Sequence, residues 1–193
     1  GIIKFSIQKR IFKEKQKRKK PFDHPLFTEH RVSDVIMERD AMLHFPYHSF
    51  APLIDLIREA AFDPDVTSIK ITCYRLAQQS RIINALINAV RNGKEVVVML
   101  ELRARFEEEA NIEWKNRLEE EGAKVLVEIP AMKVHSKMCI IRKKVKDTQV
   151  QYGFVSTGNL NEKTSRVYGD HCLLTSNVRI MADVARIFSY LEQ

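Results

Sequence analysis

The sequence lacks any apolar run that approaches the roughly 20 residues that a membrane-spanning helix requires. Residues 1–20 also lack the apolar segment and the small-residue cleavage site of a secretory signal. There is no internal repeat, and the one low-complexity segment is basic and N-terminal. We therefore expect a soluble protein, and the 45% hydrophobic and 30% charged residues are typical of a globular domain.

Cysteine is scarce, with Cys73, Cys139 and Cys172 widely spaced in apolar, strand-like stretches. An odd number of thiols in such positions predicts free, buried cysteines in a reducing compartment, and the lack of a C-x-x-C pair argues against zinc. Five of the six histidines also show no spacing typical of a metal site: His24, His30, His44, His48 and His171.

A chain of 193 residues can bury roughly 70% of its unfolded surface around one core, so we expect a single domain.

Residues 1–20 hold nine Lys or Arg and one Glu, a local charge of +8. Because the net charge of the chain is +7, the rest of the chain carries −1. Such a segment indicates either a solvated linker, which we favour, or an arm that touches a polyanion. We accordingly expect a basic connector over 1–32 and a domain over 33–193 without a uniformly basic nucleic-acid-binding face. Because the chain begins with Gly and stops within a helical pattern, we expect it to be a fragment.

Hydrophobic periodicity predicts alternating helices and strands. After a short helix with Ser33 as its N-cap, helices are expected over 49–62, 81–94, 107–122 and 178–193. Strands are expected over 67–76, 95–102, 123–130 and 168–177, with an antiparallel hairpin formed by 133–145 and 149–159. A strand-helix-strand-helix-strand order predicts parallel pairing, so the whole reads as an α/β domain.

Lys133, His135 and Lys137 alternate in KVHSKMCII, a stretch that reads as a strand. Alternate side chains on a strand share a face, so the three should be neighbours. A nearby ammonium group disfavours imidazolium, so we expect His135 to be neutral and nucleophilic near neutral pH, in surroundings that favour a phosphate. The alternative is the exposed face of an edge strand, where lysine is common and the histidine is accidental.

Other polar residues fall at predicted strand ends, where the binding groups of such sheets collect. Arg75 closes the first strand and Arg105 precedes a helix, so their guanidinium groups could converge on one phosphate or form two structural ion pairs. Asn159 and Lys163 lie in a polar turn, STGNLNEKTSR, which either binds an anion or is an ordinary capped turn. Tyr168 either stacks on a base or fills the core.

Several motifs together resemble the bacterial long-chain type of polyphosphate kinase. In chain order they are FPYHSF, KITCYR, SRIINALINAVRNGKEV, ELRARFEEEAN, KVHSK and STGNLNEKTSRVYGDH. The resemblance covers residues 33–193 and is to the first of the family's two C-terminal catalytic domains. It implies an α/β, phospholipase D-like mixed β-sheet flanked by helices on both faces.

The resemblance implies reversible transfer of the ATP γ-phosphate to inorganic polyphosphate through a phosphohistidine at His135. It also implies that Arg75 and Arg105 belong to the phosphate and Mg²⁺ site. Because a guanidinium group has no lone pair to offer a cation, we place both at phosphate oxygens and assign no protein ligand to Mg²⁺. The other expected roles are nucleotide contact by Tyr168, charge stabilisation by Lys137, and phosphate binding by Asn159 and Lys163.

The implied ligands are ATP or ADP, inorganic polyphosphate and Mg²⁺, with no specific nucleic acid. The implied setting is a homo-oligomeric cytoplasmic enzyme, or one that associates with the membrane as a full-length complex. The phospholipase D pattern places Asp seven residues after its histidine, where this chain has Arg142. This difference argues against the first alternative function, a phospholipase D-like phosphodiesterase or nuclease. The second alternative is a non-enzymatic module that binds polyanions. Because the family's other domains are missing, the fragment alone should lack full turnover.

Overall fold

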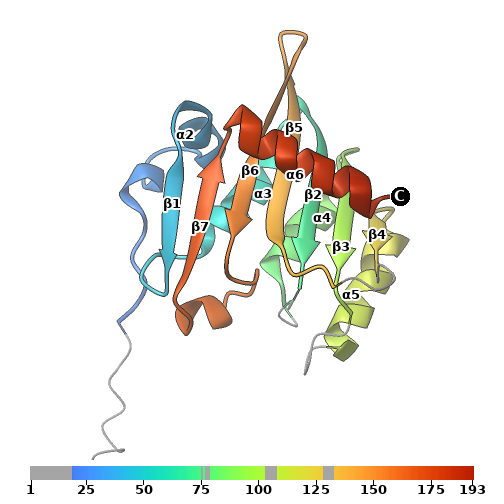
Figure 1. Cartoon of the computed structure of the whole chain (residues 1–193), viewed down its shortest axis with the longest axis horizontal. Helices are drawn as coiled ribbons and strands as arrows, with labels where there is room; N and C mark the ends of the chain where they lie inside the picture. The colour runs from blue at the N-terminus through green and yellow to red at the C-terminus, as the bar shows by residue number, and fades with distance from the viewer. Residues whose placement is uncertain (1–18, 75, 77–78, 103–107, 128–132) are drawn as a thin grey trace, which may run out of the picture.

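The computed structural model describes residues 19–74, 76, 79–102, 108–127 and 133–193, which form a seven-stranded β-sheet with flanking helices (Figure 1). In sheet order the strands are β1 (Ala41–Phe45), β7 (Asp170–Thr175), β6 (Thr148–Ser156), β5 (Lys137–Val145), β2 (Val66–Cys73), β3 (Glu95–Leu100) and β4 (Lys124–Leu126). Within the described ranges the helices are η1 (Pro25–Phe27), α2 (Val32–Glu38), α3 (Ala51–Phe62), α4 (Arg81–Arg91), α5 (Glu108–Glu120), η2 (Thr164–Arg166) and α6 (Val178–Leu191).

The sheet is mixed, as the family resemblance implies. β2, β3 and β4 run parallel, because α4 and α5 each carry the chain back across the sheet before the next strand. β5 pairs antiparallel with β2 and forms the predicted hairpin with β6, and β7 and β1 continue the antiparallel half. Lys146 and Asp147 make the hairpin turn with φ of 45° and 65°, the positive values that a tight two-residue hairpin turn favours.

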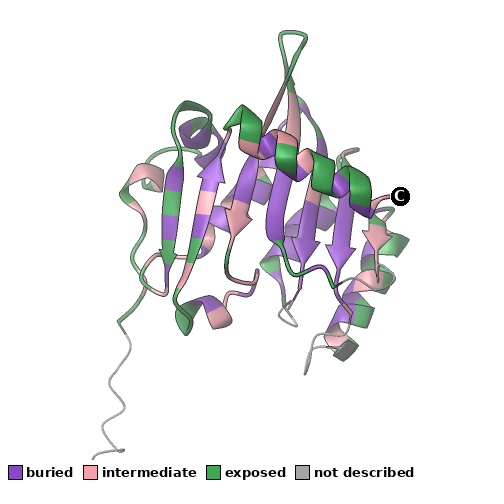
Figure 2. Cartoon of the chain, viewed as in Figure 1, coloured by how far each residue is buried: buried purple, intermediate pink, exposed green. Residues whose placement is uncertain are grey.

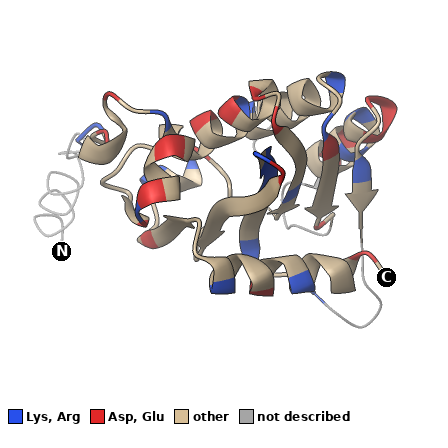
Figure 3. Ribbon diagram, turned by 90° about the horizontal axis from the view of Figure 1, so that it is seen from above, with Lys and Arg blue, Asp and Glu red and all other residues tan. Residues whose placement is uncertain are grey.

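Helices cover both faces of the sheet (Figure 3). On one face α2, α3, α4 and α5 pack over a large core that includes Ile71 and Phe154. On the other face α6 packs Met181 and Phe188 into a smaller cluster with Met138 of β5. The central strands β2, β3 and β5 are therefore largely buried on both sides (Figure 2).

The predicted helix over 81–94 forms as α4, and local signals account for both of its ends. Ser80 is the N-cap, and its hydroxyl oxygen accepts the N–H of Ile83 at 3.3 Å. Gly93 follows the helix with a φ of 79°, a conformation that favours glycine. The helix thus begins soon after β2 and ends just before β3, as a parallel crossover requires.

The predicted N-cap of the first α-helix is wrong. The helix α2 begins at Val32 with Arg31 as its N-cap, so Ser33 lies inside the helix. Glu59 of α3 replaces a local cap, because its two carboxylate oxygens accept the N–H groups of Val32 and Ser33, each at 2.8 Å. A carboxylate also interacts favourably with a helix N-terminus.

Among the differences from the sequence prediction, two concern β1 and β5. β1 lies in a proline-bearing segment whose pattern predicts no element. The strand predicted from residue 133 begins only at Lys137, because Ser156, its partner in β6, is the last residue of that strand. Val134 nevertheless packs with Met138 in the cluster beneath α6.

The cysteine prediction is confirmed for pairing and burial, since Cys73, Cys139 and Cys172 are free and buried. Burial raises the pKa of the Cys73 and Cys172 thiols to about 12, so both are thiols near neutral pH. No helix in the described ranges has both the length and the apolar character needed to cross a membrane.

The described part of the predicted connector is bound to the domain. The N–H of Phe22 donates to the carbonyl of Tyr47 at 2.9 Å, and the N–H of Ser49 donates to the carbonyl of Phe22 at 2.8 Å. The rest of the basic segment, residues 1–18, lies outside the described residues. Its role as linker or polyanion-binding arm therefore stays a prediction.

Candidate functional site

Tyr74, His135 and Lys137 come together where β2 ends and β5 begins. The Nζ atom of Lys137 lies 3.1 Å from each ring nitrogen of His135. The rings of Tyr74 and His135 meet edge to face, with 5.2 Å between centroids, and the Nζ atom of Lys133 lies 5.4 Å from the Tyr74 centroid. The structure thus brings the three alternating residues of the KVHSK motif around one tyrosine ring.

Thr72 of β2 holds the start of β5 in place. Its hydroxyl group donates to the carbonyl of Ser136 at 2.7 Å and accepts the N–H of Met138 at 3.0 Å. These two peptide groups flank Lys137, and Thr72 is only 3% exposed. Thr72 therefore fixes the backbone that carries Lys137 beside the His135 ring.

The two reactive candidates differ in exposure. His135 is exposed, whereas Lys137 is only 4% exposed. Charges away from water interact more strongly with their neighbours, and an ammonium group beside the ring nitrogens disfavours the imidazolium form. The arrangement therefore places a cation beside the His135 ring, where it can attract an anionic electrophile that approaches the imidazole.

The loop between β6 and β7 begins at the same end of the sheet, because Ser156, the last residue of β6, pairs with Lys137. Asn159 is half-buried, and its Oδ1 atom is buried without a hydrogen-bond partner among the described residues. Lys163 is exposed, and Tyr168 is 60% exposed. Tyr168 is thus a surface residue in this chain and does not fill the core.

Close contacts shape this loop. A Cβ atom on Gly158 would lie 2.6 Å from the Cγ atom of Asp170, and the hydroxyl of Thr157 donates to the same carboxylate at 2.8 Å. Farther along, the side-chain oxygen of Asn161 accepts the N–H groups of Lys163 and Thr164 at 3.0 and 3.2 Å and so starts η2. The turn that carries Asn159 and Lys163 is therefore a capped turn, whatever else it binds.

Arg75 and Arg105 lie outside the described residues, and the convergence of their guanidinium groups stays a prediction. The ends of the strands that precede them in sequence are described. The Nδ2 atom of Asn111 in α5 donates to the carbonyl of Glu101 at 2.9 Å and lies 3.4 Å from the carbonyl of Tyr74. Asn111 thus ties together the ends of β2 and β3, at the edge of the sheet that both arginines follow in sequence.

The described residues do not form a protein-held Mg²⁺ site. Within the described ranges no group of three or more His, Cys, Asp or Glu side chains could hold a metal ion. Among the described residues, the side chains in contact with His135 include the ammonium group of Lys137 and the ring of Tyr74, and an ammonium group has no electron pair for a cation. Mg²⁺ often binds mainly through substrate phosphates and water, which would require few ligands from this chain.

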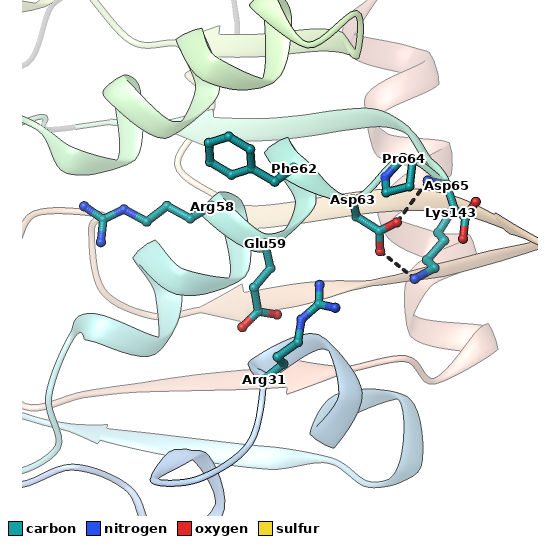
Figure 4. Close-up of a pocket in the computed structure, with 8 residues that line it drawn as sticks. All are labelled: Arg31, Arg58, Glu59, Phe62, Asp63, Pro64, Asp65 and Lys143. Carbon is teal, nitrogen blue, oxygen red and sulfur yellow. Dashed lines mark hydrogen bonds and ion pairs between the residues drawn. The ribbon is translucent and has the colours of Figure 1, made fainter.

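A cavity of about 610 Å³ lies at the opposite end of the sheet (Figure 4). It is lined by Arg31, Arg58, Glu59, Phe62, Asp63, Pro64, Asp65 and Lys143. Besides the capping carboxylate of Glu59, its charged groups include Asp63, which accepts from Lys143 Nζ at 2.5 Å and from the N–H of Asp65 at 2.9 Å. Burial alone would raise the pKa of Asp63, but these hydrogen bonds and the charge of Lys143 hold it below its ordinary value.

This cavity is not the site predicted around His135. Lys143 pairs with Val66 at the first residue of β2, whereas Tyr74 directly follows the last. Eight residues of strand separate the two, a distance of about 25 Å. The cavity's acidic groups hold α2 and the part of the hairpin near its turn, which is a structural role.

Thr72 and Tyr74 are parts of the site that the sequence does not reveal. Both lie in or beside an ordinary alternating strand, and their contacts exist only because β2 pairs with β5, a strand much later in the chain. Nothing in the local pattern distinguishes them from other strand residues. The order of strands in the sheet is the information that was missing.

Comparison with solved structures first defines the class. The chain matches a phospholipase D family member, Nuc from Salmonella typhimurium, with a TM-score of 0.58 over 78% of this chain and 91% of that chain. It matches NucT from Helicobacter pylori with a TM-score of 0.59 over 79% and 94%. At 16% and 12% identity these likenesses show the fold alone, an α/β domain of the phospholipase D type.

The family model for polyphosphate kinase C-terminal domain 1 matches residues 31–193, so the chain belongs to this family. It is 49% identical to the polyphosphate kinase of Salmonella typhimurium and 48% identical to that of Escherichia coli, in each case over 159 residues. The crystal structure of polyphosphate kinase from Porphyromonas gingivalis superimposes with a TM-score of 0.80 at 35% identity, over 91% of this chain and 29% of that chain. Each of these two sequence matches covers 82% of this chain but only 23% of the relative, so the chain spans about a quarter of the relatives' length.

Proposed function

We propose that this chain is the histidine-bearing catalytic domain of a polyphosphate kinase, and that His135 carries the phosphoryl group. The proposal rests mainly on one observation: the buried Lys137 ammonium group lies 3.1 Å from both nitrogens of an exposed His135 ring. Membership of the polyphosphate kinase C-terminal domain 1 family supports the choice of reaction.

The reaction proceeds in two transfers. A lone pair of neutral His135 attacks the γ-phosphorus of ATP, the N–P bond forms, the bond to the bridging oxygen breaks, and ADP leaves. The terminal phosphate oxygen of inorganic polyphosphate then attacks the phosphohistidine, the N–P bond breaks, and the chain grows by one unit. Each step is reversible, and covalent catalysis divides one difficult transfer into two easier ones.

The cationic residues stabilise the charge of the transferred group. Lys137 lies closest to the His135 ring, and we assign Arg75, Arg105, Asn159 and Lys163 to phosphate oxygens by family resemblance and loop position. Tyr168 is assigned to the nucleotide, and its exposure is compatible with stacking on a base. Mg²⁺, when bound to the nucleotide, would neutralise phosphate charge.

Whole-enzyme properties extend this proposal. We infer that full turnover needs the regions of the relatives that this chain does not span, and that the full-length protein is a homo-oligomer. We place it in the cytoplasm, with membrane association as a property of the full-length complex. Each point follows from the family resemblance.

The test uses the full-length protein and ATP radiolabelled in its γ-phosphate. His135→Ala should abolish acid-labile labelling and polyphosphate synthesis, whereas the matched control His30→Ala, which changes an exposed histidine near α2, should retain both. Persistent labelling of His135→Ala would refute the assignment. Release of nucleotides or choline without ATP would favour a phosphodiesterase. Polyanion binding that survives His135→Ala but is lost when residues 1–20 are deleted would favour a binding module.

A further inference from the structure

The ring of Tyr74 is a common contact of the three side chains in the KVHSK motif. The Nζ atoms of Lys133 and Lys137 lie 5.4 and 5.2 Å from its centroid, and the His135 ring packs against it with an interplanar angle of 74°. Tyr74 itself is 7% exposed, so the ring is held within the protein. A single buried ring thus touches the proposed nucleophile and both flanking cations.

An aromatic ring suits this position for an electrostatic reason. The face of the ring carries partial negative charge and attracts ammonium groups within about 6 Å. Two ammonium groups near one another repel, and each also repels a protonated imidazole. The face of the Tyr74 ring attracts both ammonium groups and so offsets part of their mutual repulsion.

Asn111 anchors the ring through the backbone. It is fully buried, and its Nδ2 atom donates to the carbonyl of Glu101 at 2.9 Å and contacts the carbonyl of Tyr74 at 3.4 Å. Because Tyr74 lies just beyond the end of β2, its peptide has left the ladder of the sheet. The Asn111 amide donates to the Tyr74 carbonyl and so restricts the backbone that carries the ring.

We propose that Tyr74 is a positioning residue for phosphoryl transfer at His135, with Asn111 as its anchor. The ring holds the histidine and the two lysines in the geometry that a γ-phosphate meets, and its aromatic face is the property that matters. This inference rests on the proposed function, in which His135 is the phosphorylated residue.

The experiment measures single-turnover phosphoenzyme formation in the full-length kinase that contains this domain. Tyr74→Leu should slow phosphorylation at saturating ATP by about 10²-fold, because displacing a reactive group by about 1 Å has an effect of this size, and should leave the KM for ATP within about threefold. Tyr74→Phe should retain the wild-type rate within about threefold, because it keeps the ring. Phe154→Leu is the matched control, since it removes a fully buried ring of the same sheet elsewhere and should leave the rate of folded enzyme unchanged.

Tyr74→Met and Asn111→Leu cover the case in which Tyr74→Leu does not fold. Met fills a similar apolar volume without a ring, and its rate should fall like that of the Leu variant. Asn111→Leu should also slow phosphorylation, by a smaller factor than the Leu and Met variants of Tyr74.

Two results would overturn this inference while leaving the proposed function intact. One is a wild-type rate in both the Leu and Met variants of Tyr74, with the wild-type label on His135. The other is a Phe variant as slow as the Leu variant, which would assign the effect to the hydroxyl group. A wild-type label on a residue other than His135 would instead overturn the proposed function itself.

Discussion

Replacing Thr72 with Val removes the two hydrogen bonds that hold the start of β5 and preserves the side-chain volume. The hydroxyl group donates to Ser136 and accepts from Met138, at 2.7 and 3.0 Å. Leaving a buried partner unsatisfied costs about 1–3 kcal/mol, and the exposed Ser136 regains water more readily than the buried Met138 N–H. We therefore expect Thr72→Val to lower the free energy of unfolding by about 2–4 kcal/mol, which for a chain of this length lowers Tm by roughly 5–15 °C.

Urea and thermal unfolding of wild type, Thr72→Val and Thr72→Ser measure this effect. Ser retains the hydroxyl group and should recover most of the loss, apart from about 1 kcal/mol for the missing methyl group. In the full-length enzyme the Val variant should also form phosphoenzyme more slowly, because Lys137 loses its fixed position beside His135. A Val variant within about 0.5 kcal/mol of wild type, the usual range for uninvolved positions, would refute the anchoring role.

Three further substitutions test Lys137, the ion pair of Asp63 with Lys143, and the loop between β6 and β7. Lys137→Met should slow phosphoenzyme formation by about 10²–10³-fold, with Tm nearly unchanged, and a rate near wild type would remove Lys137 from the mechanism. Asp63→Asn should lower the free energy of unfolding by about 1.5–3 kcal/mol at pH 7, because Lys143 loses its charged partner. Since the folded-state pKa of Asp63 is lowered, this difference should be present above about pH 4 and vanish as the pH falls through the folded-state pKa; a pH-independent difference would contradict the ion pair. Gly158→Ala should lower the free energy of unfolding by about 1–3 kcal/mol, because its Cβ overlaps Asp170, and a neutral effect in thermal unfolding would show that the loop adapts freely.

The parts of the fold that depend on local chemistry could be predicted from the sequence. The helix α4 shows both a capping Ser80 and a following Gly93, and its apolar residues recur at helical spacing. The hairpin of β5 and β6 is likewise encoded by two strand patterns around a short polar turn. Residues that are close in sequence supply the whole signal in both cases.

The predictions that were wrong or incomplete concern features that depend on contacts between residues distant in sequence. Ser33 was a reasonable local cap, but Glu59 of another helix provides the acceptors. The pattern after residue 133 predicts a longer strand than β5, because the point at which its partner ends, Ser156, depends on the sheet and not on the KVHSK motif. For the same reason the spacing of Lys133, His135 and Lys137 predicted that they would be neighbours but did not indicate Tyr74, the residue on which they meet.

In the proposed reaction the imidazole of His135 accepts the γ-phosphoryl group of ATP. The most direct test of this step is to trap the phosphoenzyme of the full-length protein at alkaline pH, digest it and locate the phosphate by peptide mass spectrometry. We expect a phosphate on His135, within the peptide that contains KVHSK. Phosphate found reproducibly on another residue, with the KVHSK peptide unmodified, would contradict the proposed reaction.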